Sequence, residues 1–274
     1  MKQILDVTLD EATHVYSDSN NQKYDSVTTI LGHYKEKFDP YKIKADGNTI
    51  IGGYVEKHGF TEEYWLNEWE KTKNNACRRG TAWHKIKEEI DNQAESIKYE
   101  MVKPTHSVRY LQKEVDRNPG IDYSKLPNGS YQELTIFNRR FMIAGQADKV
   151  VIEDGWFDII DYKTNGEFNM VSFKPPRGSH KMMYRPLHKL MDCHLGHYTA
   201  QLSTYAWMLK QFGLKPRKLS LLHTQILPEH EERILAGIDI PDLEPTLYDV
   251  NYEEEIVIAM VKDFVNNVRR KKTV

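Results

Sequence analysis

The sequence predicts an α/β fold in which helices flank a central mixed sheet, and three observations lead to this class. Apolar residues recur with helical spacing through much of the first half of the chain. From Tyr131 onward the pattern changes to short strands separated by turn residues, which indicates an antiparallel meander. A helical stretch then precedes one more strand-like run at residues 219–223, so this strand is expected to join the meander after a helical crossover.

The N-terminal part is expected to form a hairpin followed by helices. Residues 14–24 indicate two short strands around a turn rich in Asn and Ser. Ser26 is a suitable N-cap for a helix whose apolar residues begin at Val27, and a second helical stretch is expected after residues 39–40. A longer amphipathic run over residues 61–90 keeps the helical period.

The second half is expected to contain the sheet and two further helices. Residues 134–160 hold three short apolar runs with turn residues between them, which is typical of a meander. An irregular segment follows at about 165–195. A helix around residues 202–209 and a last amphipathic helix at 256–268 complete the expected elements.

The composition is typical of a globular chain that buries a sizeable core. Of 274 residues, 39% are hydrophobic and 28% charged. The longest apolar run, residues 256–261, is far shorter than the roughly 20 residues of a membrane helix, so no membrane contact is expected. We expect one structural domain, in which residues 1–75 form a hairpin and helical elaboration packed on a core of residues 76–274.

The net charge and the two cysteines limit which partners and which cellular compartment are expected. The net charge of −2 is not that of a polycation, so any contact with nucleic acid has to be local. Cys77 and Cys193 do not form a disulfide framework, and the charged start of the chain lacks an apolar signal core. A reducing intracellular setting is therefore expected, which would be the host cytoplasm if a phage encodes the protein.

Two carboxylates and a lysine are expected to meet on the predicted sheet. Asp161 and Lys163 are two positions apart on one strand, so their side chains project from the same face. Asp148 lies on the preceding strand, where a hairpin brings it level with Asp161. Carboxylate oxygens on a rigid sheet suit Mg²⁺ or Mn²⁺, and a lysine beside them would orient or deprotonate water and neutralise charge on a phosphodiester. A surface ion pair also explains an isolated Asp-x-Lys.

Four spaced motifs follow one another along the chain, and their combination is more specific than any one of them. They are Gly80-x3-His84-x3-Glu88, Gly145-x2-Asp148-x-Val150, Asp161-x-Lys163-Thr164 and Gln201-x3-Tyr205. In order and in expected secondary structure they resemble the motifs of the RecB-like branch of PD-(D/E)xK nucleases. Residues 24–31 also resemble the opening of phage and mitochondrial single-strand exonucleases of this branch.

The resemblance implies a restriction-endonuclease-like core with a metal-dependent site. His84, Asp148 and Asp161 would be ligands of Mg²⁺ or Mn²⁺, and Lys163 would be the catalytic lysine acting with the two aspartates. Glu133 would be a further catalytic acidic residue that supports the metal; the alternative is a strand-edge glutamate that faces water.

The resemblance and the basic clusters also predict where DNA would lie. Gln201 and Tyr205 would shape the site or contact DNA. An inserted basic loop at about 165–195 is expected to cover the site and guide a single strand, although a solvated surface loop is the alternative. The predicted DNA contacts are Ser26, Thr28, Arg78, Arg79, Lys174, Arg177, Lys181, Arg185, Gln201 and Tyr205.

The sequence offers little for an iron–sulfur cluster, ATP or zinc, and its tryptophans have two interpretations. Iron–sulfur members of the branch need four cysteines, and two are present, so no cluster is expected. No phosphate-binding Gly-x4-Gly-Lys-Ser/Thr loop occurs, so no ATP is expected. The histidines around Cys193 have poor spacing for zinc. Trp65, Trp69 and Trp83 would pack in a core or stack on unpaired bases.

The implied function is a Mg²⁺- or Mn²⁺-dependent deoxyribonuclease of phage type. It would act as an exonuclease on single strands or DNA ends in replication, recombination or repair, with proteins of those processes as partners. The alternatives are a catalytically silent nucleic-acid-binding or virion-associated module and a structure-selective endonuclease. The retained carboxylates and Lys163 favour activity, because clustered carboxylates without a metal repel each other.

Overall fold

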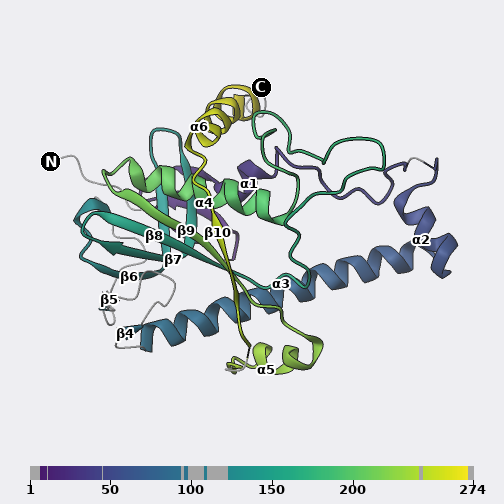
Figure 1. The fold of residues 1–274 in the computed structure, drawn as a ribbon, viewed down its shortest axis with the longest axis horizontal. Helices are drawn as coiled ribbons and strands as arrows, with labels where there is room; N and C mark the ends of the chain where they lie inside the picture. The colour runs from purple at the N-terminus through teal and green to yellow at the C-terminus, as the bar shows by residue number, and fades with distance from the viewer. Residues whose placement is uncertain are drawn as a thin grey trace.

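The computed structural model places one mixed sheet between layers of helices (Figure 1). It describes residues 7–10, 12–44, 46–93, 96–97, 108–109, 123–240 and 243–270. Within these residues the main sheet has eight strands in the order β1-β2-β3-β7-β8-β9-β10, with β6 paired to β7. They are β1 (Val7–Asp10), β2 (Val15–Asp18), β3 (Lys23–Ser26), β6 (Gly129–Asn138), β7 (Ile143–Glu153), β8 (Trp156–Lys163), β9 (Lys215–His223) and β10 (Thr246–Val250). A separate pair consists of β4 (Ser96–Ile97) and β5 (Val108–Arg109).

The middle of the sheet contains the predicted meander and crossover. Strand β6 pairs antiparallel with β7, and β7 pairs antiparallel with β8. Helix α4 (His194–Lys210) then leads to β9, which runs parallel to β8 and places His223 beside Lys163. A parallel neighbour needs a crossover of this kind. The prediction of an α/β fold with a mixed sheet flanked by helices is confirmed.

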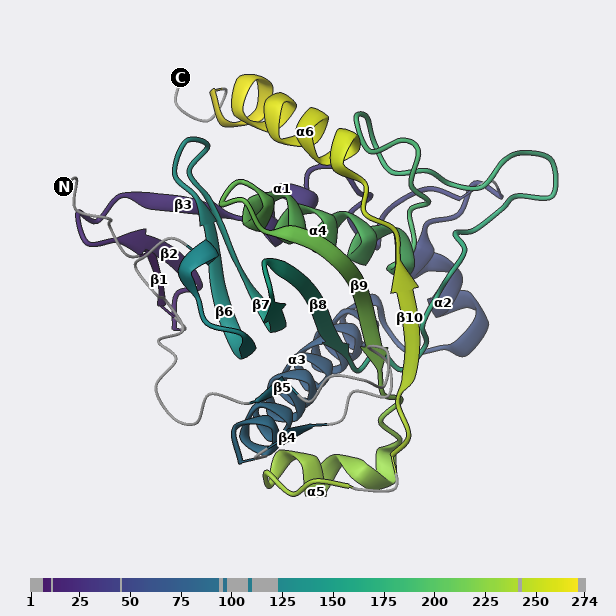
Figure 2. The ribbon, with the colours of Figure 1, turned by 60° about the vertical axis from the view of Figure 1, so that its left-hand side comes forward.

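The helices cover the two faces of the sheet unequally (Figure 2). Helix α4, with α1 (Val27–Leu31) and α6 (Glu254–Asp263), lies on one face. On the other face lies α3 (Glu62–Gln93), with α5 (Glu231–Leu235) packed beside it. Helix α2 (Ile50–His58) packs on α3, the π-helical turn η3 (Phe264–Arg269) extends α6, and the 3-10 turns are η1 (Tyr123–Lys125) and η2 (Pro228–His230).

Alternation along β8 decides which face carries its polar residues. Phe157 and Ile159 are fully buried in the main core, which α4 closes with residues such as Leu202. Because side chains alternate along a strand, Asp161 and Lys163 belong to the same face as Ile159, toward α4. The apolar part of that face therefore ends where the charged residues begin.

The long helix α3 has two environments along its length. Its N-terminal part carries Trp65 and Trp69, whose rings contact Tyr54 of α2 in edge-to-face geometry. Further along, Trp83 and Ile86 are buried in a second, smaller core shared with α5. Trp83 is thus a packing residue, as the core interpretation predicted. None of the described helices combines the length and the apolar character that a membrane span requires.

The structure differs from several sequence-based boundaries. The division between residues 75 and 76 falls inside α3, which is one continuous helix. The predicted hairpin is present as β2 and β3, but β3 also enters the main sheet, where it runs parallel to β7. The second helix begins only at Ile50, because Thr49 supplies its N-cap by accepting a hydrogen bond from Gly52. Strands β1 and β10 and helix α5 were not expected.

Candidate functional site

Strand β7 lies at a fork between two other strands. Strand β6 occupies one edge of β7 almost throughout. On the other edge, β8 pairs with β7 from Lys149 to Glu153, whereas β3 pairs with Ile143 and Ala144. Residues 145–148 therefore pair with neither β8 nor β3 on this edge, and we call this gap in the pairing the fork. Asp148 occupies this fork at the last position before the β8 ladder begins.

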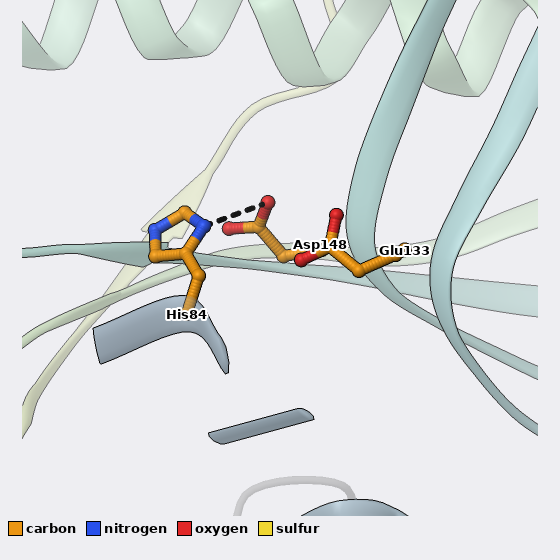
Figure 3. A group of neighbouring side chains, drawn as sticks. All are labelled: His84, Glu133 and Asp148. Atoms are coloured by element: carbon orange, nitrogen blue, oxygen red, sulfur yellow. Dashed lines mark ion pairs between the residues drawn. The ribbon is translucent and has the colours of Figure 1, made fainter. Parts of the chain in front are cut away.

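Asp148 and His84 are both held by the backbone of Tyr162. The Tyr162 N–H donates to Asp148 Oδ2 at 2.6 Å, and the Tyr162 carbonyl oxygen lies 2.9 Å from His84 Nε2. A carbonyl oxygen only accepts, so His84 Nε2 must carry the hydrogen. In the neutral ring the lone pair is then on Nδ1, which lies 3.5 Å from Asp148 Oδ1 (Figure 3).

Glu133 enters the same group through an unusual backbone conformation. The β6–β7 register pairs Gln132 with Lys149 and Leu134 with Ala147, so Glu133 lies opposite Asp148 where the ladder is interrupted. Its φ is 49°, in the left-handed region that costs an L-residue about 1–2 kcal/mol. Ligand atoms of His84, Glu133 and Asp148 all lie within 4.8 Å of one another (Figure 3). Glu133 is thus partly buried in this group rather than at a water-facing strand edge.

Asp161 and Lys163 form an ion pair beside this group. The pair joins the buried Asp161 Oδ2 to Lys163 Nζ. Burial, followed by repulsion from Asp148, raises the pKa of Asp161 to about 6. Burial alone would lower the pKa of Lys163, but the charges of Asp161 and Asp148 raise it overall. Lys163 is therefore held as a cation.

Helix α4 closes the site from above with three residues on one stripe. Lys163 Nζ lies 4.8 Å from the ring centre of Tyr198, and Gln201 Nε2 donates to the Tyr205 hydroxyl at 3.1 Å. Tyr205 is only 2% exposed, so its hydroxyl does not reach the surface and is bonded to Gln201 inside the protein. A Cβ at Gly145 would lie 2.5 Å from Tyr205 Cε1, which explains why this position needs glycine.

The donor set fits a divalent cation. One imidazole nitrogen and two carboxylates converge from α3, β6 and β7, and the neighbouring Asp161 offers a further buried carboxylate that pairs with Lys163. Oxygen-rich sets of this kind suit Mg²⁺ or Mn²⁺. The ligand set expected from the sequence is His84, Asp148 and Asp161. The group whose ligand atoms lie within 4.8 Å of one another contains Glu133 in place of Asp161.

The predicted DNA contacts lie in different surroundings. Ser26 caps α1 by accepting from the Thr29 N–H, and Thr28 is exposed beside it. Arg78 is exposed, whereas Arg79 lies 3.7 Å from Glu231. These four positions are not part of the His84, Glu133 and Asp148 group.

The inserted segment at 165–195 is irregular, as expected, but its cations are not equivalent. Lys181 forms ion pairs with Glu36 and with Asp192, the latter at 2.8 Å, so it ties the segment to the body of the protein. Its assignment as a DNA contact stays a prediction, made for a lysine that already has two carboxylate partners. The remaining three predicted contacts are exposed, and we refer to them as the loop cations: Lys174, Arg177 and Arg185.

The histidines near Cys193 are used in other ways. His197 Nε2 lies 2.6 Å from Asp192, and His194 Nδ1 accepts from the Asn169 N–H. The Cys193 thiol donates to the Met170 carbonyl oxygen. Among the described residues, only His84, Glu133 and Asp148 form a group with the spacing of metal ligands. The zinc interpretation gains no support from this geometry.

Two contributors to the site escaped the sequence analysis. Tyr198 precedes Gln201 by three residues and so shares its helical stripe, a signal that was available. The backbone of Tyr162 gave no signal, because an N–H and a carbonyl are present at almost every residue.

A comparison of the chain with models of protein families gives no match, and a comparison with curated protein sequences gives none either.

Proposed function

We propose that this protein is a Mg²⁺- or Mn²⁺-dependent deoxyribonuclease of the PD-(D/E)xK superfamily, in its RecB-like branch. The observation that carries the proposal is the meeting of His84, Glu133 and Asp148 beside the Asp161–Lys163 pair. These residues come from α3 and from three successive strands, and every motif of the resemblance contributes to one site. A chance surface ion pair would not be buried among further acidic groups.

The arrangement of elements supports a restriction-endonuclease-like core. The meander β6-β7-β8 carries the three acidic residues, α4 leads to the parallel strand β9, and α3 supplies His84 from the opposite face. A meander followed by a crossover helix is the order that the resemblance implies.

The residues present divide the work of phosphodiester hydrolysis among them. His84 Nδ1, Glu133, Asp148 and Asp161 would hold the cation, which when bound polarises a phosphate oxygen and makes water a better nucleophile. The Lys163 ammonium would stabilise negative charge that develops on the phosphate. Tyr198 covers Lys163 and limits the access of water to it. Asp148 is oriented by the Tyr162 N–H, so one of its oxygens is committed before any ligand binds.

An exonuclease acting on single strands or DNA ends is the favoured activity. The loop cations are exposed on the segment that leaves β8 directly after Lys163, where they would contact a phosphate backbone. The same segment exposes Phe173 and Tyr184, at 74% and 52%, as surfaces for stacking on unpaired bases. Action in replication, recombination or repair, inside a cell and without ATP, is part of this proposal.

The test is a digestion time course with end-labelled single- and double-stranded oligonucleotides in Mg²⁺, Mn²⁺ or EDTA. We expect cleavage that requires the metal and that falls 10²-fold or more, as for a lost electrostatic catalyst, in Lys163→Ala and Asp161→Asn. Lys218→Ala, which removes a cation paired with Asp249 on β9 and β10, is the matched control and should cleave normally. Cleavage by Lys163→Ala at the wild-type rate would refute the assignment.

A silent nucleic-acid-binding module is the second candidate. The exposed loop cations and aromatics favour it independently of the carboxylates. Its signature would be binding of the same oligonucleotides with no product in either metal. Internal cuts at branched substrates, with free ends left intact, would indicate a structure-selective endonuclease instead.

A further inference from the structure

A buried ionic network lies directly beneath the fork, on the α3 face of the sheet. Lys149 Nζ donates to Asp91 Oδ2 at 2.6 Å, and the Tyr162 hydroxyl donates to the same oxygen at 2.9 Å. The three residues, Lys149, Asp91 and Tyr162, are 1%, 5% and 6% exposed. A buried lysine and carboxylate are costly to keep away from water, so their presence here asks for an explanation beyond packing.

Two of the three network residues are sequence neighbours of candidate site residues. Lys149 follows Asp148 on β7 and forms the last β8 pair before the fork, opposite Ile160. Tyr162 stands between Asp161 and Lys163 on β8. A shift of either network residue would therefore carry its catalytic neighbour along the same backbone.

Asp91 connects this pair of strands to the helix that supplies His84. It follows His84 by seven residues, which is about two turns of α3, so both point toward the sheet from one helix face. Tyr162 consequently forms two hydrogen bonds with α3. Its carbonyl oxygen accepts from His84 Nε2, and its hydroxyl donates to Asp91.

We propose that Asp91, Lys149 and Tyr162 are positioning residues that fix the opening of the β7–β8 fork and with it the geometry of Asp148 and His84. Asp91 holds β7 through Lys149 and β8 through the Tyr162 hydroxyl. The backbone of Tyr162 then holds Asp148 with its N–H and sets the His84 tautomer with its carbonyl oxygen. Partners that orient ligands in this way commonly change metal affinity 10- to 100-fold. This inference rests on the metal site of the proposed function.

The variant that tests it is Tyr162→Phe, which keeps the ring and the backbone and removes the bond to Asp91. Its matched control is Tyr34→Phe, because the hydroxyl of the buried Tyr34 also donates to a carboxylate, Asp263 Oδ2, at 2.8 Å, but between the turn after α1 and the end of α6. Both variants lose one buried hydrogen bond to a carboxylate. A purely structural role of Tyr162 would make them equivalent at the metal site.

Two readouts separate positioning from stability, both taken where circular dichroism shows the variants to be folded. A Mn²⁺ titration monitored by isothermal calorimetry should show that Tyr162→Phe binds Mn²⁺ about tenfold more weakly than the wild type. Tyr34→Phe should bind Mn²⁺ with unchanged affinity. Long-range ¹H–¹⁵N spectra of the metal-free proteins, with His84 assigned by His84→Gln, should show Nε2 protonated in the wild type and a mixture of tautomers in Tyr162→Phe.

The two readouts also distinguish failure of this inference from failure of the proposed function. Wild-type Mn²⁺ affinity together with a wild-type His84 tautomer in Tyr162→Phe would overturn the positioning role. A wild-type protein that does not bind Mn²⁺ would remove the metal site from the proposed function. In that case the tautomer spectra alone decide whether the network positions His84.

Discussion

Replacing Asp161 by asparagine is expected to stabilise the metal-free protein while it destroys the site. Asp161 is 1% exposed, and its carboxylate lies near Asp148 as well as Lys163. A carboxyl with a pKa of about 6 instead of its ordinary 3.8 costs roughly 3 kcal/mol to ionise at neutral pH. Asparagine carries no such charge, so at neutral pH a gain of up to about 3 kcal/mol in unfolding free energy is expected.

The gain should depend on pH in a defined direction. The folded chain keeps a proton on Asp161 up to about pH 6, whereas the unfolded chain releases it near 3.8. Between these values the folded state binds more protons, so wild-type stability falls as the pH rises through this window. The advantage of Asp161→Asn is therefore complete above about pH 6 and nearly absent at about pH 4.

Urea denaturation in EDTA at both ends of this window measures the effect. The control is Asp158→Asn on the same strand, because Asp158 is also 1% exposed but accepts hydrogen bonds from Arg217 Nε and Nη2. That variant should lose about 1.5–3 kcal/mol, the contribution of hydrogen bonds to charged groups. If Asp161→Asn is less stable than the wild type at neutral pH, the attraction of Lys163 for the Asp161 carboxylate exceeds the cost of burying it, and the predicted gain is refuted.

Three other changes have expected outcomes. Asp91→Asn should lower the unfolding free energy by about 3–5 kcal/mol, because it removes the charged partner from the buried Lys149–Asp91 pair. Asp249→Asn at an exposed pair should cost less than about 1 kcal/mol, and equal losses in urea denaturation would contradict this. Gly145→Ala should cost about 1–3 kcal/mol through its clash with a buried tyrosine, and Gly166→Ala, with open space around it, should be neutral by the same measurement. Replacing all three loop cations by alanine should weaken DNA binding and flatten its salt dependence by about 0.7 for each single-strand phosphate that is no longer neutralised; an unchanged slope in titrations at several salt concentrations would make the segment an ordinary surface loop.

The parts of the fold that follow from local pattern were predictable, and those that depend on distant pairing were not. The meander, the crossover helix and the Ser26 cap each have a signal within a few residues, and the structure contains all three. Strand β10 lies between charged and proline-containing segments and exists because β9 offers it an edge. The parallel pairing of β3 with β7 joins residues more than a hundred positions apart, which no local pattern encodes.

The site shows the same division. The spacing of Asp161 and Lys163 placed them on one face, and helical spacing placed Gln201 and Tyr205 together. The ion pairs of Lys181 were not predictable, because both partner carboxylates lie outside the basic run in which the sequence places it. The sequence shows only that Lys181 is a cation. Whether a cation can contact DNA depends on which carboxylates the fold places beside it.

Three features at the fork depart from the regular, low-energy structure of a sheet. Glu133 adopts a left-handed conformation, the buried carboxylate of Asp161 is repelled by Asp148, and the β7–β8 ladder stops where Asp148 accepts from the Tyr162 N–H. Each would be relieved by an ordinary residue or an ordinary strand pair, and the well-packed core on both sides shows that the chain builds such structure readily. Strain of this kind persists where the surroundings impose it, and it gathers at sites whose ligand makes use of it. A divalent cation held between Asp148 and Asp161 would offset the repulsion between these carboxylates, so the proposed metal site would account for the like charges that the fold gathers at the fork.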